Sequence, residues 1–152
     1  MKDDVRLREV VSASDRSKLA KLSFEIFECQ TTRDAILHHS DGSVFLFVEA
    51  LDQVVGFVGA EMRVVDRGIR LGWSGVVPAL RKRGLFRAAL DLLEERLSRD
   101  FPSAEYMIEN GPIEVREVFE ALGFEFLGVK DGVAKLVRPI RLRRSNASGI
   151  ER

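Results

Sequence analysis

Four cationic side chains surround a glycine where a strand-like segment gives way to a helical one. The run Arg81-Lys82-Arg83-Gly84-Leu85-Phe86-Arg87 comes shortly after Val76-Val77-Pro78. The first backbone N–H groups of a helix have no partner inside it, and its dipole makes that end positive, so a helix start attracts phosphate. Gly84 has no side chain where backbone and anion must approach closely. We therefore predict an anion-binding turn, with a solvated basic turn as the alternative.

The elements that must position this turn follow from the spacing of apolar residues. Strands are predicted at about 5–11, 44–50, 54–65, 69–77, 104–109, 124–129 and 133–137, and helices at about 15–29, 31–38, 84–99 and 112–122. Asp66-Arg67-Gly68 is typical of a hairpin turn, and Gly123 is placed to end a helix in a left-handed conformation. The order predicts a mixed α/β or α+β domain, with a largely antiparallel sheet and one strand-helix-strand crossover at about 69–109.

Composition and motif spacing exclude several classes of function. The sequence contains neither the P-loop pattern nor the G-x-G-x-x-G dinucleotide pattern. Its formal net charge is zero, which disfavours a general nucleic-acid or membrane binder. The single cysteine, Cys29, can form neither an internal disulfide nor a zinc site without several other ligands. No apolar signal core opens the chain, and no apolar run approaches the ~20 residues of a membrane span. We expect a cytoplasmic protein without a metal, organised as one domain over residues 1–139.

Residues 140–152 are predicted to form a basic, polar C-terminal tail, because the chain becomes rich in arginine and serine from about Arg138. Binding of nucleic acid through these arginines is an unfavoured alternative, because the run is short and the domain is neutral.

Three segments resemble the GCN5-related N-acetyltransferase (GNAT) family. Arg81-x-x-Gly84-x-Phe86 is similar to its acyl-CoA signature Q/R-x-x-G-x-G/A, with Phe86 in place of the last small residue. Phe119-Glu120-Ala121-Leu122-Gly123-Phe124 is similar to its Tyr-Glu-Lys-Leu-Gly-Phe segment, and Asn110 to its strand-end asparagine. The order of elements matches over about residues 5–139. The resemblance implies a central, mostly antiparallel, twisted sheet of about seven strands with about four helices, in which two parallel strands splay apart near Val77 and Asn110.

The resemblance also implies a cofactor site. Acetyl-CoA or another acyl-CoA would be the co-substrate, with its pantetheine amides paired to the backbone of Gly75, Val76 and Val77. The backbone amides of residues 83–87 would hold the pyrophosphate. The full set of expected cofactor-binding residues is Gly75, Val76, Val77, Arg81, Lys82, Arg83, Gly84, Leu85, Phe86, Arg87 and Asn110.

The transfer reaction needs a proton acceptor for the attacking amine and a path for the leaving thiolate. Glu61 lies among small and apolar residues, where partial burial suits a base, and Ser74 could orient a water; both also fit as ordinary strand residues. Trp73 and His38-His39 are further candidates for the acceptor side, with packing and surface roles as the alternatives. Phe119 replaces the family's tyrosine and has no proton to give.

The function expected from this resemblance is an N-acyltransferase that moves an acyl group from acyl-CoA to the amine of a small molecule or a protein. The alternative is an acyl-CoA-binding module whose catalytic activity has lapsed, which the substitution at Phe119 favours. The family analogy also leaves a homodimer open, and we expect no nucleic-acid or membrane partner.

Overall fold

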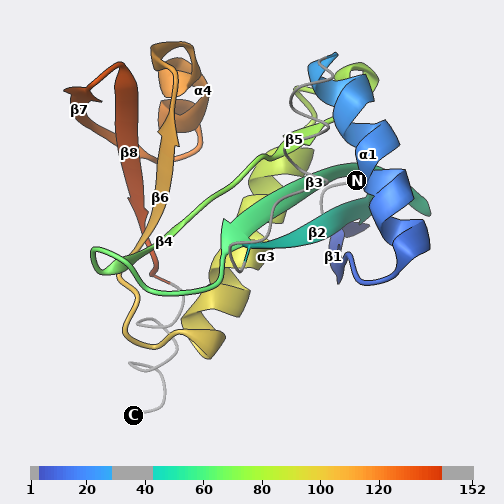
Figure 1. The fold of residues 1–152 in the computed structure, drawn as a ribbon, viewed down its shortest axis with the longest axis horizontal. Coiled ribbons are helices and arrows are strands. Elements are labelled where there is room, and N and C mark those ends of the chain that lie inside the picture. The colour runs from blue at the N-terminus through green and yellow to red at the C-terminus, as the bar shows by residue number, and fades with distance from the viewer. Residues whose placement is uncertain (1–3, 29–42, 142–152) are drawn as a thin grey trace. The chain divides into compact units, whose positions relative to one another are not determined.

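A computed structural model describes residues 4–28 and 43–141 (Figure 1). The chain divides into two units, the first made of Met1–Glu61 and Gly72–Leu92 and the second of Met62–Leu71 and Leu93–Arg152. The predicted helix 31–38, with Cys29 and His38-His39, lies outside the described residues. In the part of the chain that the structure describes, no helix is both long and apolar enough to cross a membrane.

The first unit contains a four-stranded antiparallel sheet with the strand order β1-β2-β3-β5. Its strands are β1 (Arg6–Glu9), β2 (Ser43–Ala50), β3 (Gln53–Glu61) and β5 (Gly75–Val76). Helix α1 (Ala13–Phe27) begins with a capping box, in which the Ser12 side chain and the Asp15 side chain each accept from the other's backbone N–H. The helix lies beside β2 and β3 in Figure 1. Its buried face packs against the sheet through Leu19, Leu22, Ile26, Phe47 and Phe57.

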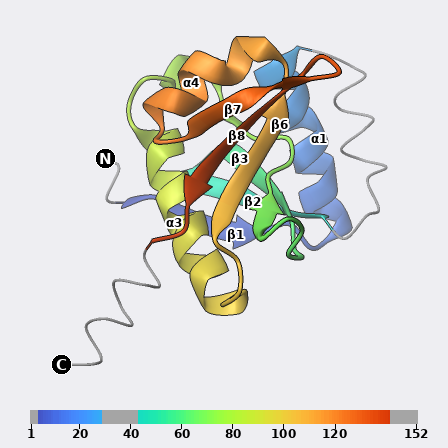
Figure 2. The same ribbon diagram turned by 90° about the vertical axis from the view of Figure 1, so that its left-hand side faces the viewer.

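The second unit contains a sheet with the strand order β4-β6-β8-β7. Its strands are β4 (Gly68–Arg70), β6 (Tyr106–Gly111), β7 (Glu125–Lys130) and β8 (Val133–Pro139). The short η3 (Ile113–Val115) leads into α4 (Arg116–Ala121), which lies across β7 and β8 in Figure 2. Gly123, at a φ of 93°, takes up the left-handed conformation predicted for the end of this helix.

Helix α3 (Leu85–Asp100) contributes to both units. Leu85, Ala89 and Leu90 are buried in its first half, and Leu93 and Leu97 in its second. Ala89, Leu90, Leu93 and Leu97 belong to the apolar face from which this helix is predicted, whereas Leu85 is buried and the predicted Phe86 is only half-buried. These buried residues fix the helix start that follows the cationic turn.

The predicted strand 69–77 is interrupted in the structure. Its first part, β4, pairs in parallel with β6, and its last part, β5, pairs antiparallel with β3 in the other sheet. Residues 72–74 lie in no strand, and polar contacts to Gly59 take the place of a regular ladder there. Gly72 N–H donates to Gly59 O (2.7 Å), and Gly59 N–H donates to the Ser74 hydroxyl (3.0 Å).

The second unit holds the chain beyond Arg138, where its composition becomes basic, and residues 142–152 of the predicted tail lie outside the described residues. Arg138 and Pro139 are the last residues of β8, and Ile140 is only 2% exposed. The Glu94 carboxylate holds this segment in place, because it accepts hydrogen bonds from both the Arg138 guanidinium and the Arg141 N–H. Composition alone suggests a tail because this buried partner lies more than 40 residues away in the sequence.

Candidate functional site

The cationic turn links β5 to α3 through a short 3-10 helix, η2 (Pro78–Leu80). Two of its residues have left-handed backbones, Lys82 at a φ of 66° and Gly84 at a φ of 77°. Ala88 N–H donates to Gly84 O (3.0 Å), so the helical bonding of α3 starts from the carbonyl of Gly84. The left-handed glycine therefore turns the chain so that a helix start follows the basic residues directly.

Positive charge dominates this helix start. Lys82, Arg83 and Arg87 are exposed, and the first turn of α3 contains no acidic residue. Neither Lys82 nor Arg83 forms an ion pair with a residue that the structure describes. Cations at a helix start oppose the dipole, so a bound anion would relieve an electrostatic cost. Leu85 is 1% exposed and Phe86 is half-buried, which directs these two side chains toward the protein.

Arg81 differs from the other cations of the turn. Its Nε donates to Val76 O (3.0 Å), and its Nη2 donates to Ile26 O (3.1 Å). The guanidinium is thus held by two backbone carbonyls of the first unit.

The open edge of β5 presents one backbone amide. Val77 N–H donates to Val55 O (2.8 Å), so Val77 faces β3. Backbone groups alternate along an antiparallel pair, which turns the N–H and carbonyl of Val76 away from β3 and those of Gly75 toward it. Because Arg81 occupies the Val76 carbonyl, the Val76 N–H is the group left at this edge for a ligand.

Ser74 and Glu61 belong to the same corner of the first unit. The Ser74 hydroxyl accepts from Gly59 N–H (3.0 Å) and donates to Gly72 O (3.1 Å), so its proton is held by the backbone. Glu61 is half-buried at the end of β3, two positions after Gly59 on the same face of the strand. Trp73 is 46% exposed, and its ring lies 5.6 Å from that of Phe27, centroid to centroid. Roles for Glu61 and Ser74 in catalysis stay predictions.

In the second unit, Asn110 is exposed on β6, opposite Lys135 of β8. Phe119 is 8% exposed, and its ring meets that of Phe124 edge to face at 5.0 Å. The phenylalanine in place of the family's tyrosine therefore packs as a core residue. Binding of a cofactor by Asn110 stays a prediction.

Sequence reasoning missed Glu109, a carboxyl group inside the second unit. Glu109 shares its face of β6 with Met107, which is fully buried, and its strand partner Leu136 is also fully buried. One carboxyl oxygen lies 3.1 Å from the position that a Cβ on Gly111 would occupy. Burial raises the pKa of Glu109 to about 8. The signal was the two-residue alternation with Met107, which places Glu109 on a buried face.

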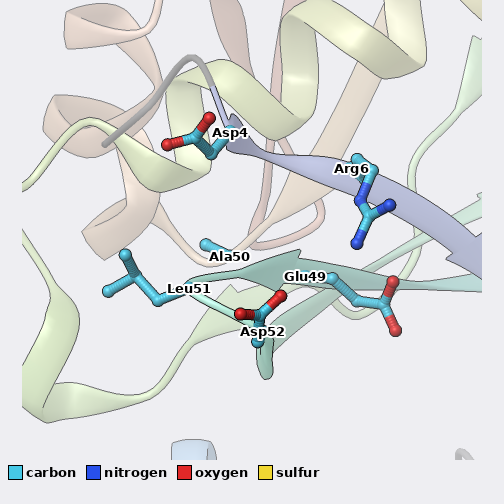
Figure 3. Close-up of a pocket in the computed structure, with 6 residues that line it drawn as sticks. All are labelled: Asp4, Arg6, Glu49, Ala50, Leu51 and Asp52. Carbon is cyan, nitrogen blue, oxygen red and sulfur yellow. The ribbon is translucent and has the colours of Figure 1, made fainter.

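A hollow of about 520 Å³ lies elsewhere in the first unit, beside the β2–β3 turn (Figure 3). Its lining residues are Asp4, Arg6, Glu49, Ala50, Leu51 and Asp52. Over residues 4–28 and 43–141, no group of three or more histidine, cysteine, aspartate or glutamate side chains is arranged to hold a metal ion.

Comparison with known proteins identifies the fold. No protein-family model and no curated protein matches the sequence. Among solved structures, Tetrahymena GCN5 is similar with a TM-score of 0.71 at 11% identity, over 89% of this chain and 96% of that one. A chimeric spermidine N-acetyltransferase from Vibrio cholerae and hSSAT is similar with a TM-score of 0.68 at 16% identity, over 93% and 98%. A Bacillus subtilis acetyltransferase in complex with CoA gives 0.66 at 12%, over 89% and 98%. The chain therefore has the GNAT fold, as the sequence resemblance predicts.

Proposed function

We propose that the protein is an acyl-CoA-dependent N-acyltransferase that transfers an acyl group to an amine, with acetyl as the proposed acyl group. The cationic turn carries this proposal: a left-handed glycine introduces a helix start without acidic residues, next to two exposed cations that no described residue neutralises. A pyrophosphate supplies the matching charge. Similar structures named as a CoA complex and as a spermidine N-acetyltransferase support an acyl-CoA donor and an amine acceptor.

The residues of the first unit suit the separate tasks of this reaction. The amides at the start of α3 bind the pyrophosphate, and the Val76 N–H pairs with an amide carbonyl of pantetheine. The neutral amine attacks the thioester carbonyl, so that a C–N bond forms and the C–S bond breaks. The amine proton passes to the Glu61 carboxylate, directly or through a water. The CoA thiolate leaves as an anion and takes its proton from solvent, because Phe119 cannot supply one.

Turnover of acetyl-CoA tests this function. Thiol release should appear with at least one member of a panel containing polyamines, arylalkylamines, and peptides with free α-amino groups or lysines. Glu61→Gln is expected to lower kcat roughly 100-fold, the range typical of a lost general base, and to leave the affinity for CoA unchanged. Equal kcat values for the wild type and Glu61→Gln would remove Glu61 from the mechanism.

A lapsed, acyl-CoA-binding module is the second candidate, and two observations favour it. Phe119 is packed against Phe124 as a core residue, and the Ser74 hydroxyl is engaged with the backbone. This candidate predicts that CoA and acetyl-CoA raise the melting temperature while no amine in the panel releases thiol. Thiol release with any amine that Glu61→Gln suppresses would refute it.

Gly84→Ala is expected to weaken acyl-CoA binding about tenfold. An alanine at a φ of 77° is strained by roughly 1–2 kcal/mol, and the turn relaxes by moving its amides away from the anion. Gly132→Ala is a matched control, because Gly132 has a φ of 78° in the β7–β8 turn with nothing within 4 Å of an added Cβ. Both variants should lose similar stability in urea, and only Gly84→Ala should bind acyl-CoA more weakly in calorimetry. A similar loss of affinity in both would contradict the role of the turn.

Several finer points stay predictions under this proposal. The acceptor is a small-molecule or protein amine, the acyl group is acetyl, and the protein works in the cytoplasm. Sedimentation can measure whether the protein forms the homodimer that the family analogy leaves open.

A further inference from the structure

The Arg81 side chain joins two segments that are far apart in the sequence. Val76 O, its first acceptor, lies on β5 five residues earlier, and Ile26 O, its second, lies 55 residues earlier in the last turn of α1. The two bonds measure 3.0 and 3.1 Å, and both acceptors are backbone atoms. The guanidinium fork therefore fixes the end of a helix to the strand that precedes the cationic turn.

The end of α1 provides a favourable environment for this cation. The helix ends at Phe27, Glu28 follows with a left-handed φ of 53°, and the last turn contains no basic residue of its own. The last carbonyls of a helix lack partners inside it and carry the negative end of the dipole. Arg81 supplies both a donor and a positive charge to this end.

The same turn of α1 packs directly on β5. A Cβ on Gly75 would lie 2.8 Å from Ile26 Cγ2 and 3.6 Å from Phe27 Cζ, so only a glycine admits α1 at this distance. Ile26 is 7% exposed within the core of the first unit. The contact is close enough for any movement of β5 to be passed to the end of α1.

Phe27 extends this connection to the candidate acceptor side. Its ring meets the half-exposed Trp73 edge to face at 5.6 Å, and the Trp73 carbonyl lies 3.0 Å from where a Cβ on Gly59 would be. Glu61 follows two positions after Gly59 on β3. The last turn of α1 thus supports the residues beside the proposed base.

We propose that Arg81 is a positioning residue that couples the cofactor turn to the last turn of α1, and not a ligand of the pyrophosphate. The coupling rests on the proposed function. When the turn holds the phosphates of an acyl-CoA, β5 and the end of α1 become fixed with it, and the Phe27–Trp73 pair takes its working position beside Glu61. Arg83 is the contrasting residue of the same turn, because it is exposed like Arg81 but forms no hydrogen bond with a described residue.

Amide hydrogen exchange of the protein without ligand tests whether the two Arg81 hydrogen bonds hold the end of α1, and it needs no activity measurement. Arg81→Lys keeps the charge but loses the planar fork that reaches both carbonyls. Exchange at residues 25–28 is expected to become roughly tenfold faster in Arg81→Lys and Arg81→Ala and to stay unchanged in Arg83→Ala. Residues 125–137 of the second unit are the internal reference and should exchange at the wild-type rate in all three. Wild-type exchange at residues 25–28 in Arg81→Lys and Arg81→Ala would overturn the proposal.

Addition of CoA to the same samples tests the coupling. In the wild type, CoA should slow exchange at residues 84–88 and also at 25–28, whereas in Arg81→Lys it should slow only 84–88. Protection of 84–88 without protection of 25–28 in the wild type would refute the coupling and leave the proposed function standing. Absence of protection at 84–88 in the wild type would refute the proposed function and the coupling together.

Steady-state kinetics separates the two roles of a cation at this turn. A positioning residue affects both substrates, so Arg81→Lys is expected to raise the KM for the amine about tenfold. Arg83→Ala should raise only the KM for acyl-CoA. An Arg81→Lys variant with the wild-type KM for the amine and a raised KM for acyl-CoA would identify Arg81 as a phosphate ligand.

Discussion

Replacing Glu94 with alanine is expected to lower the free energy of unfolding by about 3–5 kcal/mol, the cost of leaving a buried charge without its partner. Glu94 is 7% exposed on α3, and both its carboxylate oxygens are used. Oε1 accepts from the Arg138 guanidinium at 3.0 Å, and Oε2 accepts from Arg141 N–H at 2.9 Å. The side chains of Arg138 and Glu94, taken without their backbones, are only 15% and 10% exposed, so solvent screens their interaction weakly. Urea denaturation at pH 7 measures the loss.

The next residue of α3 provides a matched control. Glu95 pairs with Arg99 at 3.1 Å on the same helix, but these side chains are 48% and 63% exposed. Exposed pairs four residues apart contribute about 0.3–0.5 kcal/mol, so Glu95→Ala should cost little. Replacing Glu94 and Arg138 together with leucine should recover part of the loss, because no buried charge then lacks a partner. Equal losses for Glu94→Ala and Glu95→Ala would show that the Glu94–Arg138 pair is not a strong anchor of this unit.

Glu109→Gln is expected to stabilise the protein by about 2–3 kcal/mol at pH 8 and to have almost no effect at pH 4.5. Burial raises the pKa of Glu109 to about 8, whereas a carboxyl in an unfolded chain titrates near 4.3. Between these values the folded state binds more protons than the unfolded state, so the contribution of Glu109 to stability is fully present in acid. It is lost as the pH rises toward 8. The full shift would correspond to about 5 kcal/mol, and we reduce this because Glu109 keeps some exposure.

Urea titrations of Glu109→Gln and the wild type at half-unit intervals from pH 4.5 to 8.5 test this expectation. Glutamine has nearly the shape of the protonated acid, so the two curves should meet in acid and separate as the pH rises. Glu125→Gln, at an exposed position of β7, serves as the control and should follow the wild type throughout. A difference between Glu109→Gln and wild type that is constant with pH would contradict the assigned burial of this carboxyl group.

Local features of the fold could be predicted from short stretches of sequence. Ser12 caps α1 through residues within its own segment, Gly123 ends α4 in the predicted left-handed conformation, and Asp66 and Arg67 form the predicted turn with positive φ angles of 54° and 64°. The start of α3 after Gly84 was also predicted, to within a residue. Caps, turns and helix periodicity depend on residues only a few positions apart, so their causes lie within the segment itself.

Features that depend on distant partners could not be predicted in this way. The segment 69–77 has the composition of one strand, but its halves pair in different sheets because Gly59 binds both Gly72 and the Ser74 side chain. A glutamate in a strand is usually expected at the surface, and only the pairing of Glu109 with Leu136 of β8 shows that it faces the interior. Which strands pair across tens of residues depends on how the whole chain packs. Strand pairing in turn determines how deeply a side chain such as that of Glu109 is buried, and burial shifts its pKa.

The cationic turn shows the same division within a single motif. The sequence by itself determined its position, its glycine and the helix that follows, because these depend on backbone conformation within about seven residues. The tertiary structure decided what each cation of the turn contacts. All three cations Arg81, Lys82 and Arg83 are exposed, but only Arg81 of the three binds described backbone carbonyls, one of them in α1, 55 residues away. A side chain as long as arginine reaches whichever acceptors the packed chain brings near, and only the folded protein sets that distance.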